Sequence, residues 1–447
     1  MISHRFGSVA LAALGTIAFA AAGCGGDDDN DSGGGGASTG AKTTAPAADV
    51  SGNLSIVGIW TGDEQKSFQA VLDGFTKKYP KVKVKYNPAG DNVPTVLGTA
   101  VEGGHPPDLA AIGQPGVVKQ FQEKNALKPL DFAKSDIAAN YTPDFLKLGT
   151  IAGKLYSFVF KGANKSTVWY NVEAFKNAGV TAPKTWDEFL NNAKTLKASG
   201  VPAYSIGGGD GWTLTDLFEN IYLRQAGPDK YDQLSTHEIK WTDPTVKAAL
   251  KSMADVVGDS SNIAGGTSGA LETDFPTSVS NVFTSSPKAA QVIEGDFVPG
   301  VVASKTKLKA KTGFDVFPFP QIGSGGAAVV GGGDSIAMFK DTPAGQALVK
   351  YLASSEAAQI WAQRGGFSSP NKGVAESAYP DDITRTTATA IAKAQTFRFD
   401  MSDLAPAAFG GTPGQGEWKI LQDFLNKPDN VNGAAIKLEA SAAKAFK

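Results

Sequence analysis

A run of six residues near the middle of the chain combines a flexible backbone with one carboxylate and one large aromatic ring. The run is Gly-Gly-Gly-Asp-Gly-Trp, residues 207–212. Glycine lets a ligand approach the backbone, the Asp210 carboxylate can accept hydrogen bonds from hydroxyl groups, and the Trp212 indole can stack on an apolar face. The composition fits a polar ligand with an apolar side. The alternative is a turn whose acid is structural and whose tryptophan is packed in the core.

A helix and a short strand lead into this loop. Thr185 and Glu188 form the S/T-x-x-E capping box that begins a helix, and apolar residues follow at helical spacing. Residues 201–206 are typical of a short buried strand. Other strands are expected at 54–60, 82–86, 109–112 and 168–171.

Strand and helix signals alternate along most of the chain, which favours parallel sheets flanked by helices. Helices are expected from apolar spacing over 68–79 and from starts near Asp187, Asp216, Asp243 and Thr342. In sheets of this kind, ligands bind beyond the carboxyl ends of the strands. The loop at 207–212 follows such a strand end.

The stretch 170–223 resembles the extracellular solute-binding proteins of ABC importers, in the carbohydrate-binding family that includes the maltose/maltodextrin-binding proteins. The shared pattern is Tyr-Asn at 170–171, the Pro-x-Thr-Trp-acid-Glu-Phe helix start at 183–189, and the Gly-acid-Gly-aromatic loop. Two later stretches, 329–336 and 365–371, fit the same family. The resemblance covers nearly everything after about residue 52.

The resemblance implies a two-lobe α/β fold of the periplasmic-binding-protein type (type II). Each lobe would be a mostly parallel sheet flanked by helices, with a hinge of two or three crossovers. The expected N-terminal lobe comprises 52–163 and 321–368, and the expected C-terminal lobe 164–320 and 369–447. The chain is expected to cross between the lobes near 161–167, 314–322 and 367–371.

The resemblance also implies the substrate-binding component of an ABC importer, not an enzyme, which captures a mono- or small oligosaccharide between its lobes and delivers it to the permease. A monomer is expected, with a carbohydrate ligand and the permease subunits as partners and with no cofactor or metal. The expected ligand-binding residues are Trp60, Asp63, Glu64, Gln114, Asn164, Asp210, Trp212, Glu294, Asp296, Phe297, Asp334 and Phe409.

Several of these residues could instead have a structural role in the fold. Trp60 could be a core aromatic, Asp63 and Glu64 could be charges at a helix N-terminus, and Asp334 could be a buried structural acid. Phe297 stands where maltodextrin binders commonly carry tryptophan, which implies a ligand smaller than a maltodextrin or of another shape. One residue of the C-terminal segment is expected in the cleft, from among Arg398, Asp400, Asp403, Phe409 and Trp418.

The N-terminus is expected to be a signal peptide, residues 1–23. His4 and Arg5 precede an apolar run over 9–22 that is too short to span a bilayer. Small residues before Cys24 resemble a bacterial lipobox, which implies a lipid on Cys24 and a place on the extracytoplasmic face of the cell membrane. Leucine is preferred where Ala21 stands, so an ordinary signal peptide with an incidental cysteine is the alternative.

Composition and motifs limit which classes of protein remain possible. Residues 24–51 are rich in Gly, Asp, Ser, Thr and Ala and are expected to form a flexible linker. Lys plus Arg number 42 and Asp plus Glu 44, without a basic patch, so nucleic acid is not an expected partner. The sequence contains no HExxH, GxSxG, Walker or CxxC motif. Two alternatives stay open: a secreted carbohydrate-active enzyme with a carboxylate pair such as Asp210 and Glu294, and a surface lipoprotein without a ligand.

Overall fold

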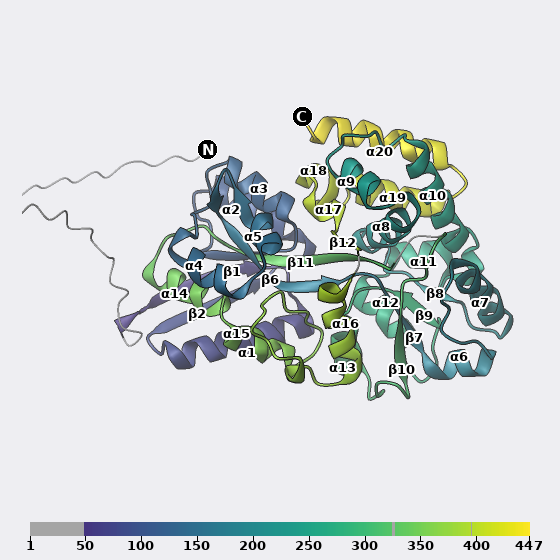
Figure 1. The fold of residues 1–447 in the computed structure, drawn as a ribbon, viewed down its shortest axis with the longest axis horizontal. Coiled ribbons are helices and arrows are strands. Elements are labelled where there is room, and N and C mark those ends of the chain that lie inside the picture. The colour runs from purple at the N-terminus through teal and green to yellow at the C-terminus, as the bar shows by residue number, and fades with distance from the viewer. Residues whose placement is uncertain (1–48, 324–326, 395) are drawn as a thin grey trace, which may run out of the picture. The chain divides into compact units, whose positions relative to one another are not determined.

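Two sheets covered by helices form most of the chain that the computed structural model describes, residues 49–323, 327–394 and 396–447 (Figure 1). All of these residues belong to one compact unit, Ala45–Lys447. The expected signal peptide, residues 1–23, lies outside the described residues, as does the expected linker up to residue 48.

The first sheet has six strands, and we call it and its helices the first lobe. Its strands are β1 (Gly52–Gly58), β2 (Val82–Pro88), β3 (Leu109–Ile112), β6 (Ser157–Asn164), β11 (Ala328–Met338) and β12 (Thr396–Phe399). Their order is β12-β11-β3-β1-β2, and β6 also pairs with β11. β1 is parallel to β2 and β3, and β12 to β11, whereas β11 is antiparallel to β3 and β6.

The second sheet has four strands, and we call it and its helices the second lobe. Its strands are β7 (Thr167–Asn171), β8 (Tyr204–Ser205), β9 (Gln291–Ile293) and β10 (Phe314–Pro318). The order is β10-β7-β9-β8, with β8 parallel to β9 and β7 antiparallel to both of its neighbours. A separate pair, β4 (Thr150–Ile151) and β5 (Lys154–Leu155), precedes β6.

The helices of the first lobe pack on its sheet through buried apolar faces. They are α1 (Gly62–Lys78), α2 (Val93–Glu102), α3 (Pro115–Glu123), α4 (Lys134–Asn140), α5 (Pro143–Gly149), α14 (Pro343–Leu352) and α15 (Ser355–Ala362). On α1, Phe68, Val71, Leu72 and Phe75 are all buried, as their helical spacing predicts. The rings of Phe68 and Trp60 lie 4.5 Å apart in this core.

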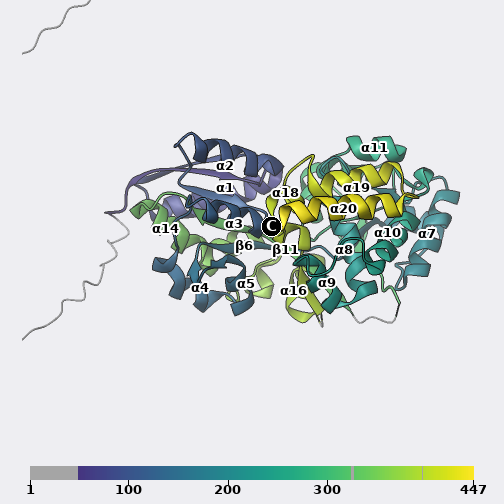
Figure 2. The same cartoon turned by 90° about the horizontal axis from the view of Figure 1, so that it is seen from above.

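The helices of the second lobe are more numerous, and Figure 2 shows α19 and α20 side by side over α8 and α10. They are α6 (Val172–Ala178), α7 (Trp186–Ala198), α8 (Trp212–Ala226), α9 (Pro228–Ser235), α10 (Pro244–Val257), α11 (Gly266–Glu272), α12 (Phe275–Val282), α13 (Val298–Lys305), α17 (Met401–Leu404), α18 (Ala407–Gly410), α19 (Gly416–Asn426) and α20 (Val431–Ala445). One further helix, α16 (Asp382–Lys393), lies along β6 and β11 and contributes to the cores of both lobes.

Several local predictions are confirmed. Thr185 Oγ1 accepts a hydrogen bond from Glu188 N, and the Glu188 carboxylate accepts one from Thr185 N, so the predicted capping box begins α7. The helices predicted near Asp216, Asp243 and Thr342 are α8, α10 and α14. The strands predicted at 82–86, 109–112 and 168–171 are β2, β3 and β7.

The expected two α/β lobes are confirmed, but the expectation of mostly parallel pairing is wrong for the second sheet, where two of three pairings are antiparallel. The reason is that β7 enters this sheet directly from β6 of the first lobe. Its direction is therefore set by that crossing, and not by a helical crossover within the sheet.

The return crossing also differs from its predicted position at 314–322. The strand β10 stays in the second sheet, and Ile322, Ala328 and Val330 still pack in the core of the second lobe. The chain returns along β11, whose first residues pair with β12 and whose last residues pair with β3. The residue boundaries predicted for the lobes stay a prediction.

Candidate ligand-binding cleft

A cleft with a volume of about 640 Å³ lies between side chains of the two lobes, a size typical of sites for small molecules. The first lobe contributes the residues that follow β1 and β3, the middle of β11 and the first turn of α1. The second lobe contributes the start of α8, the start of α12, and α13. A neighbouring recess shares Thr61, Gly90, Asp91 and Asp210 with this cleft.

The wall from the first lobe is organised around Asp334. Its Oδ2 accepts a hydrogen bond of 2.6 Å from the indole nitrogen of Trp60 and lies 3.8 Å from Lys161 Nζ. Lys161 Nζ also lies 3.0 Å from Glu64 Oε1. Burial alone would lower the pKa of Lys161, but the charges of Glu64 and Asp334 raise it, so the lysine stays charged.

The sequence predicts Asp334 at a strand end, and this is wrong, because Asp334 lies inside the eleven-residue strand β11. The register with β6 shifts between Asp334 and Ser335. Such a bulge re-aims a side chain, here toward Trp60 and Lys161. Gly332 lets the Lys165 side chain pack against this strand, because a Cβ on Gly332 would lie 2.7 Å from the Cε atom of Lys165.

The wall from the second lobe is aromatic. The rings of Trp212, Phe275 and Phe297 lie 5.1 to 5.9 Å from one another, and all three residues line the cleft. Asp210 Oδ2 accepts a hydrogen bond of 2.7 Å from the backbone nitrogen of Phe275, which fixes the start of α12 beside the glycine-rich loop. Together these residues form an apolar surface with a carboxylate at its edge.

Lys165, which follows the crossing strand β6, lies at the floor of the cleft among three carboxylates. Its Nζ lies 2.5 Å from Asp400 Oδ2, 3.1 Å from Asp216 Oδ1 and 3.3 Å from Asp403 Oδ2. It also lies 5.8 Å from the centre of the Trp212 ring. Burial opposes the charge of Lys165, but the three acids raise its pKa well above the usual value.

The buried cluster around Lys165 contains more acidic side chains than basic ones. Burial raises the pKa of Asp216 to about 8, and burial followed by the charges of Asp400 and Asp403 raises that of Glu417 well above its usual range. Glu417 is fully buried, and among the described residues neither of its carboxylate oxygens has a hydrogen-bond partner. The folded protein therefore holds protons on this cluster at neutral pH.

Asp91 of the first lobe meets the second lobe across the cleft. It precedes α2 and lines the cleft together with Trp212 of the second lobe. Burial, followed by the charge of Asp210, raises the pKa of Asp91 to about 7. Two carboxylates from opposite lobes therefore line the same cleft beside an indole ring.

The structure places the sequence-predicted residues in two groups. Eight line the cleft: Trp60, Asp63, Glu64, Gln114, Asp210, Trp212, Phe297 and Asp334. Trp60 is only 1 % exposed, so most of its ring belongs to the core of the first lobe. Four do not line the cleft: Asn164, Glu294, Asp296 and Phe409.

The last four residues are buried in structural positions. Asn164 bonds to the Ser166 and Thr387 backbones at the crossing, Asp296 accepts a hydrogen bond from the Ser368 hydroxyl, and Glu294 is 1 % exposed. Phe409 packs against Trp241 with the ring centres 5.1 Å apart. Of the five C-terminal candidates, Asp403 lines the cleft.

Among the lining residues that sequence reasoning did not select are Asp91, Lys161, Phe275 and Arg364. A signal existed for Phe275, because Asp274 and Pro276 form a helix start and so place Phe275 in a first turn, near an exposed end. Asp91 has no comparable signal, because it comes from a short connection between β2 and α2.

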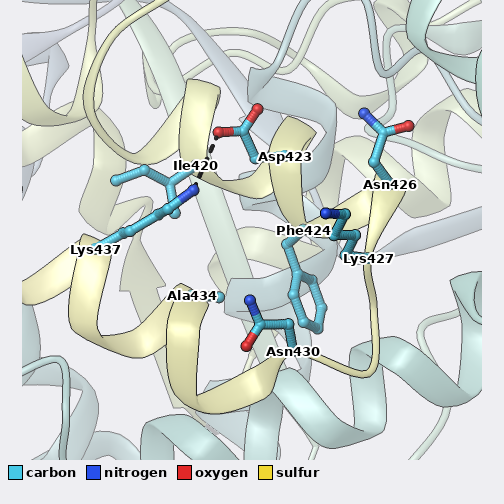
Figure 3. A pocket seen from close by; sticks show the side chains of 8 residues that line it. All are labelled: Ile420, Asp423, Phe424, Asn426, Lys427, Asn430, Ala434 and Lys437. Atoms are coloured by element: carbon cyan, nitrogen blue, oxygen red, sulfur yellow. Dashed lines mark ion pairs between the residues drawn. The ribbon is translucent and has the colours of Figure 1, made fainter.

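A smaller pocket of about 260 Å³ lies between α19 and α20 (Figure 3). Asp423 and Lys437 point toward each other there, 3.6 Å apart, and Asp423 also pairs with Lys419. Within the described ranges, no group of three or more His, Cys, Asp or Glu side chains is arranged to hold a metal ion. No helix in those same ranges is long and apolar enough to cross a membrane.

Comparison with known proteins assigns the chain to a class. The family described as bacterial extracellular solute-binding protein matches residues 60–359. The chain belongs to this family.

Two relatives cover most of the chain. The osmoprotective compounds-binding protein GgtB of Synechocystis sp. is 32 % identical over 386 residues, which are 85 % of this chain and 90 % of GgtB. The alpha-glucosides-binding periplasmic protein AglE of Rhizobium meliloti is 30 % identical over 395 residues, 86 % of this chain and 85 % of AglE.

Solved structures confirm the fold. A chitin oligosaccharide binding protein superposes with a TM-score of 0.76 at 22 % identity, over 89 % of this chain and 99 % of that chain. The solute-binding protein RafE in complex with raffinose gives a TM-score of 0.71 at 18 % identity, over 89 % of this chain and all of that chain. The expected two-lobe fold of the periplasmic-binding-protein type is thereby confirmed.

The buried acids predict how stability depends on pH. A carboxyl group whose pKa is higher in the folded than in the unfolded protein stabilises the fold at low pH, and this stabilisation is lost as pH rises toward the folded pKa. The free energy of unfolding, measured by urea denaturation, should therefore fall from pH 6 to pH 9. The slope is roughly 1.4 kcal/mol per pH unit for each group titrating in that window. The Glu417→Gln substitution should reduce this slope and raise the free energy of unfolding at pH 8.

The matched control is Glu356→Gln, which changes an exposed acid on α15 that pairs with Lys78 at the surface. It should leave the slope unchanged. An unchanged slope in Glu417→Gln would contradict the assignment of a bound proton to Glu417.

Proposed function

We propose that this protein captures a sugar, a mono- or small oligosaccharide, between its lobes and delivers it to the permease of an ABC importer. The observation that carries the proposal is the second-lobe wall, where Trp212, Phe275 and Phe297 meet the carboxylates of Asp210 and Asp91. Sugars present CH-rich faces that pack on aromatic rings and hydroxyl groups that donate to carboxylates.

The two buried lysines of the cleft do not favour an anionic ligand. Both buried lysines are already paired, Lys161 with Glu64 and Asp334, and Lys165 with three aspartates. Neither offers an uncommitted charge to an anionic group. The relatives support the same class of ligand, since their names include alpha-glucosides for AglE and multiple sugars for a Streptococcus mutans protein.

Capture would work by closure of the two lobes about β6 and β11. A ligand that contacts both walls favours the closed form by the difference in its contacts with the two forms. We assign 52–163 and 321–368 to the N-terminal lobe and 164–320 and 369–447 to the C-terminal lobe, with two exceptions. The strand β12 pairs with β11 in the first sheet, whereas Ile322, Ala328 and Val330 pack in the core of the second lobe.

Binding without turnover is the activity we propose. A glycosidase needs two carboxyl groups that flank one bond of the substrate. Glu294, the sequence candidate to act with Asp210, is 1 % exposed and does not line the cleft. The family and the superposed proteins are binding proteins, which supports the same conclusion.

The proposal is tested by thermal unfolding with a panel of maltose, sucrose, trehalose, raffinose, galactose and glucose. One sugar at a thousandfold excess over its Kd should stabilise the protein by roughly 4 kcal/mol. Amino acids and glucuronic acid serve as controls and should give no shift. A shift with an amino acid and with none of the sugars would reject the proposal.

Trp212→Ala should weaken the binding of the stabilising sugar by roughly 1.5–3 kcal/mol, about tenfold to a hundredfold or more in Kd. The reason is that Trp212 lines the cleft and supplies the largest ring of the aromatic wall. Isothermal titration calorimetry measures the loss. The control is Trp241→Ala, which removes a ring that is 1 % exposed in the second-lobe core.

Trp241→Ala should cost roughly 3–5 kcal/mol of stability and leave the affinity of the folded molecules intact. If Trp212→Ala behaves like this control, with stability lost and affinity kept, the aromatic wall is not the sugar site.

We propose further that a lipid on Cys24 anchors the protein on the extracytoplasmic face of the cell membrane. The support is the lipobox-like sequence before the only cysteine of the chain. Cys24→Ser should move the exported protein from the membrane fraction to the soluble fraction while its sugar affinity stays the same. Retention of exported Cys24→Ser protein in washed membranes would reject the anchor.

A further inference from the structure

Arg364 brings a positive charge to the cleft without an ion pair among the described residues. It follows α15 of the first lobe, is exposed, and lines the cleft. Its Nε atom donates a hydrogen bond of 3.1 Å to Ser67 Oγ on α1. Within the described part of the chain, its terminal amino groups Nη1 and Nη2 have no hydrogen-bond partner. These donors are therefore available to a bound molecule.

The backbone and a serine hold this side chain in place. Arg364 N donates to Trp361 O, and Gly365 N to Ala362 O, so the backbone of Arg364 belongs to the closing turn of α15. Gly365 has a φ of +81°, in the left-handed region that glycine favours, which ends the helix there. Because Nε belongs to the planar guanidinium group, its bond to the buried Ser67 also orients Nη1 and Nη2.

The start of α1 places acceptors beside these donors. Asp63 and Ser67 are one helical turn apart, so they lie on the same face of α1, and both line the cleft. Asp63 Oδ1 lies 2.8 Å from Lys66 Nζ, and Glu64 Oε1 lies 3.0 Å from Lys161 Nζ. Each of these acids is thus paired with a lysine, and the guanidinium of Arg364 stays uncommitted.

The second lobe faces this group with small residues. Gly300, Ala303 and Ser304 of α13 line the cleft, and Ser304 Oγ donates to a backbone oxygen of its own helix. A Cβ on Gly366 would lie 3.4 Å from the Cα of Gly300, so the two lobes approach each other here through glycines. Small residues on this wall leave space for a polar ring beside Arg364.

This group lies next to the aromatic wall but is separate from its carboxylates. The backbone oxygen of Phe297, the wall residue that precedes α13, would lie 3.4 Å from a Cβ on Gly366. Neither Arg364 nor Ser67 lines the recess that the cleft shares with Asp91. The cleft therefore has a second polar region, apart from the carboxylates at the edge of the aromatic wall.

We propose that Arg364 and Asp63 form a second subsite, which binds neighbouring hydroxyl groups of a second unit of the solute, and that Ser67 orients Arg364 for this contact. The inference rests on the proposed function and deepens it, because it makes the solute a sugar of two or more units and not a monosaccharide. Nη1 and Nη2 donate to two adjacent oxygens, in the bidentate geometry that a guanidinium group favours.

Hydroxyl groups suit this subsite better than a carboxylate does. A hydroxyl group can accept a hydrogen bond from Arg364 and donate one to Asp63, because it is both a donor and an acceptor. An ionised carboxylate can only accept, and it would be held beside Asp63 and Glu64, whose negative charges repel it. A sugar ring carries hydroxyl groups on adjacent carbons and so fits both partners.

The experiment compares sugars that differ in length. The di- or trisaccharide that stabilises the protein most in the panel is titrated by isothermal calorimetry, and so are its own monosaccharides. The longer sugar should bind the unaltered protein at least about tenfold more tightly, because only it reaches both regions. Arg364→Ala should weaken the longer sugar by about tenfold to a hundredfold, the effect of lost hydrogen bonds to a charged group, and should leave the monosaccharides unaffected.

Two further arginine variants separate the fork from the charge. Arg385→Ala is the matched control, because Arg385 pairs with Asp382 on α16 and does not line the cleft. It should leave the affinity for the longer sugar unchanged. Arg364→Lys keeps the charge but not the bidentate geometry, so it should lose nearly as much affinity as Arg364→Ala. Full affinity in Arg364→Lys would overturn the bidentate contact.

Ser67→Ala tests the positioning role of the serine. Because Ser67 acts through Arg364, its removal should weaken the longer sugar less than Arg364→Ala does, and should add nothing to Arg364→Ala in the double variant. Additive losses would show that Ser67 does not act through Arg364 and would overturn its orienting role.

Two results would overturn the second subsite while the sugar proposal stands. One is an equal loss from Arg364→Ala with the longer sugar and with its monosaccharide, because Arg364 would then bind the first unit. The other is a monosaccharide that binds the unaltered protein as tightly as the longer sugar. If no sugar of the panel binds, the proposed function itself fails, and the second subsite fails with it.

Discussion

The ion pairs of Lys165 are the interaction on which the arrangement of both lobes depends. This lysine follows the crossing strand β6, and its partners come from α8 and from α17, which are far apart in the sequence. A buried cation without partners would be very costly, so the three aspartates must remain in place around it. The C-terminal segment is thereby fixed under the crossing, and the floor of the cleft is formed before any ligand arrives.

The charges around the cleft fall into layers with different roles. The deepest layer, with Glu417, holds a proton and does not line the cleft. The middle layer is the pair of neutralised lysines. The outer layer, with Asp91 and Asp210 beside Trp212, faces the cavity from both lobes and is the part that a bound molecule meets. Affinity and specificity therefore depend on few residues, while the ionic layers behind them supply rigidity.

The fold was predictable because its signals are local. The capping box of α7, the apolar face of α1 and the short strands each depend on residues near one another in the sequence. Site residues on strand and helix ends, such as Asp210 and Trp212, were found for the same reason. Phe409 was misplaced because its segment has no helical pattern in the sequence, yet α18 packs it in the core. Asp91 was missed because the residues that it meets across the cleft, Asp210 and Trp212, are supplied by the other lobe.

The glycines of β11 have a consequence for how such a protein can diversify. Because Gly332 has no side chain, the aliphatic part of Lys165 lies directly against the strand that joins the lobes. Any side chain at that position would displace the lysine and disturb its three acids, so this strand has little freedom to vary. The segments that carry Asp91, Asp210 and Phe275 have no such constraint from Lys165. New ligand preferences can therefore arise by changes in these segments while β11 stays constant.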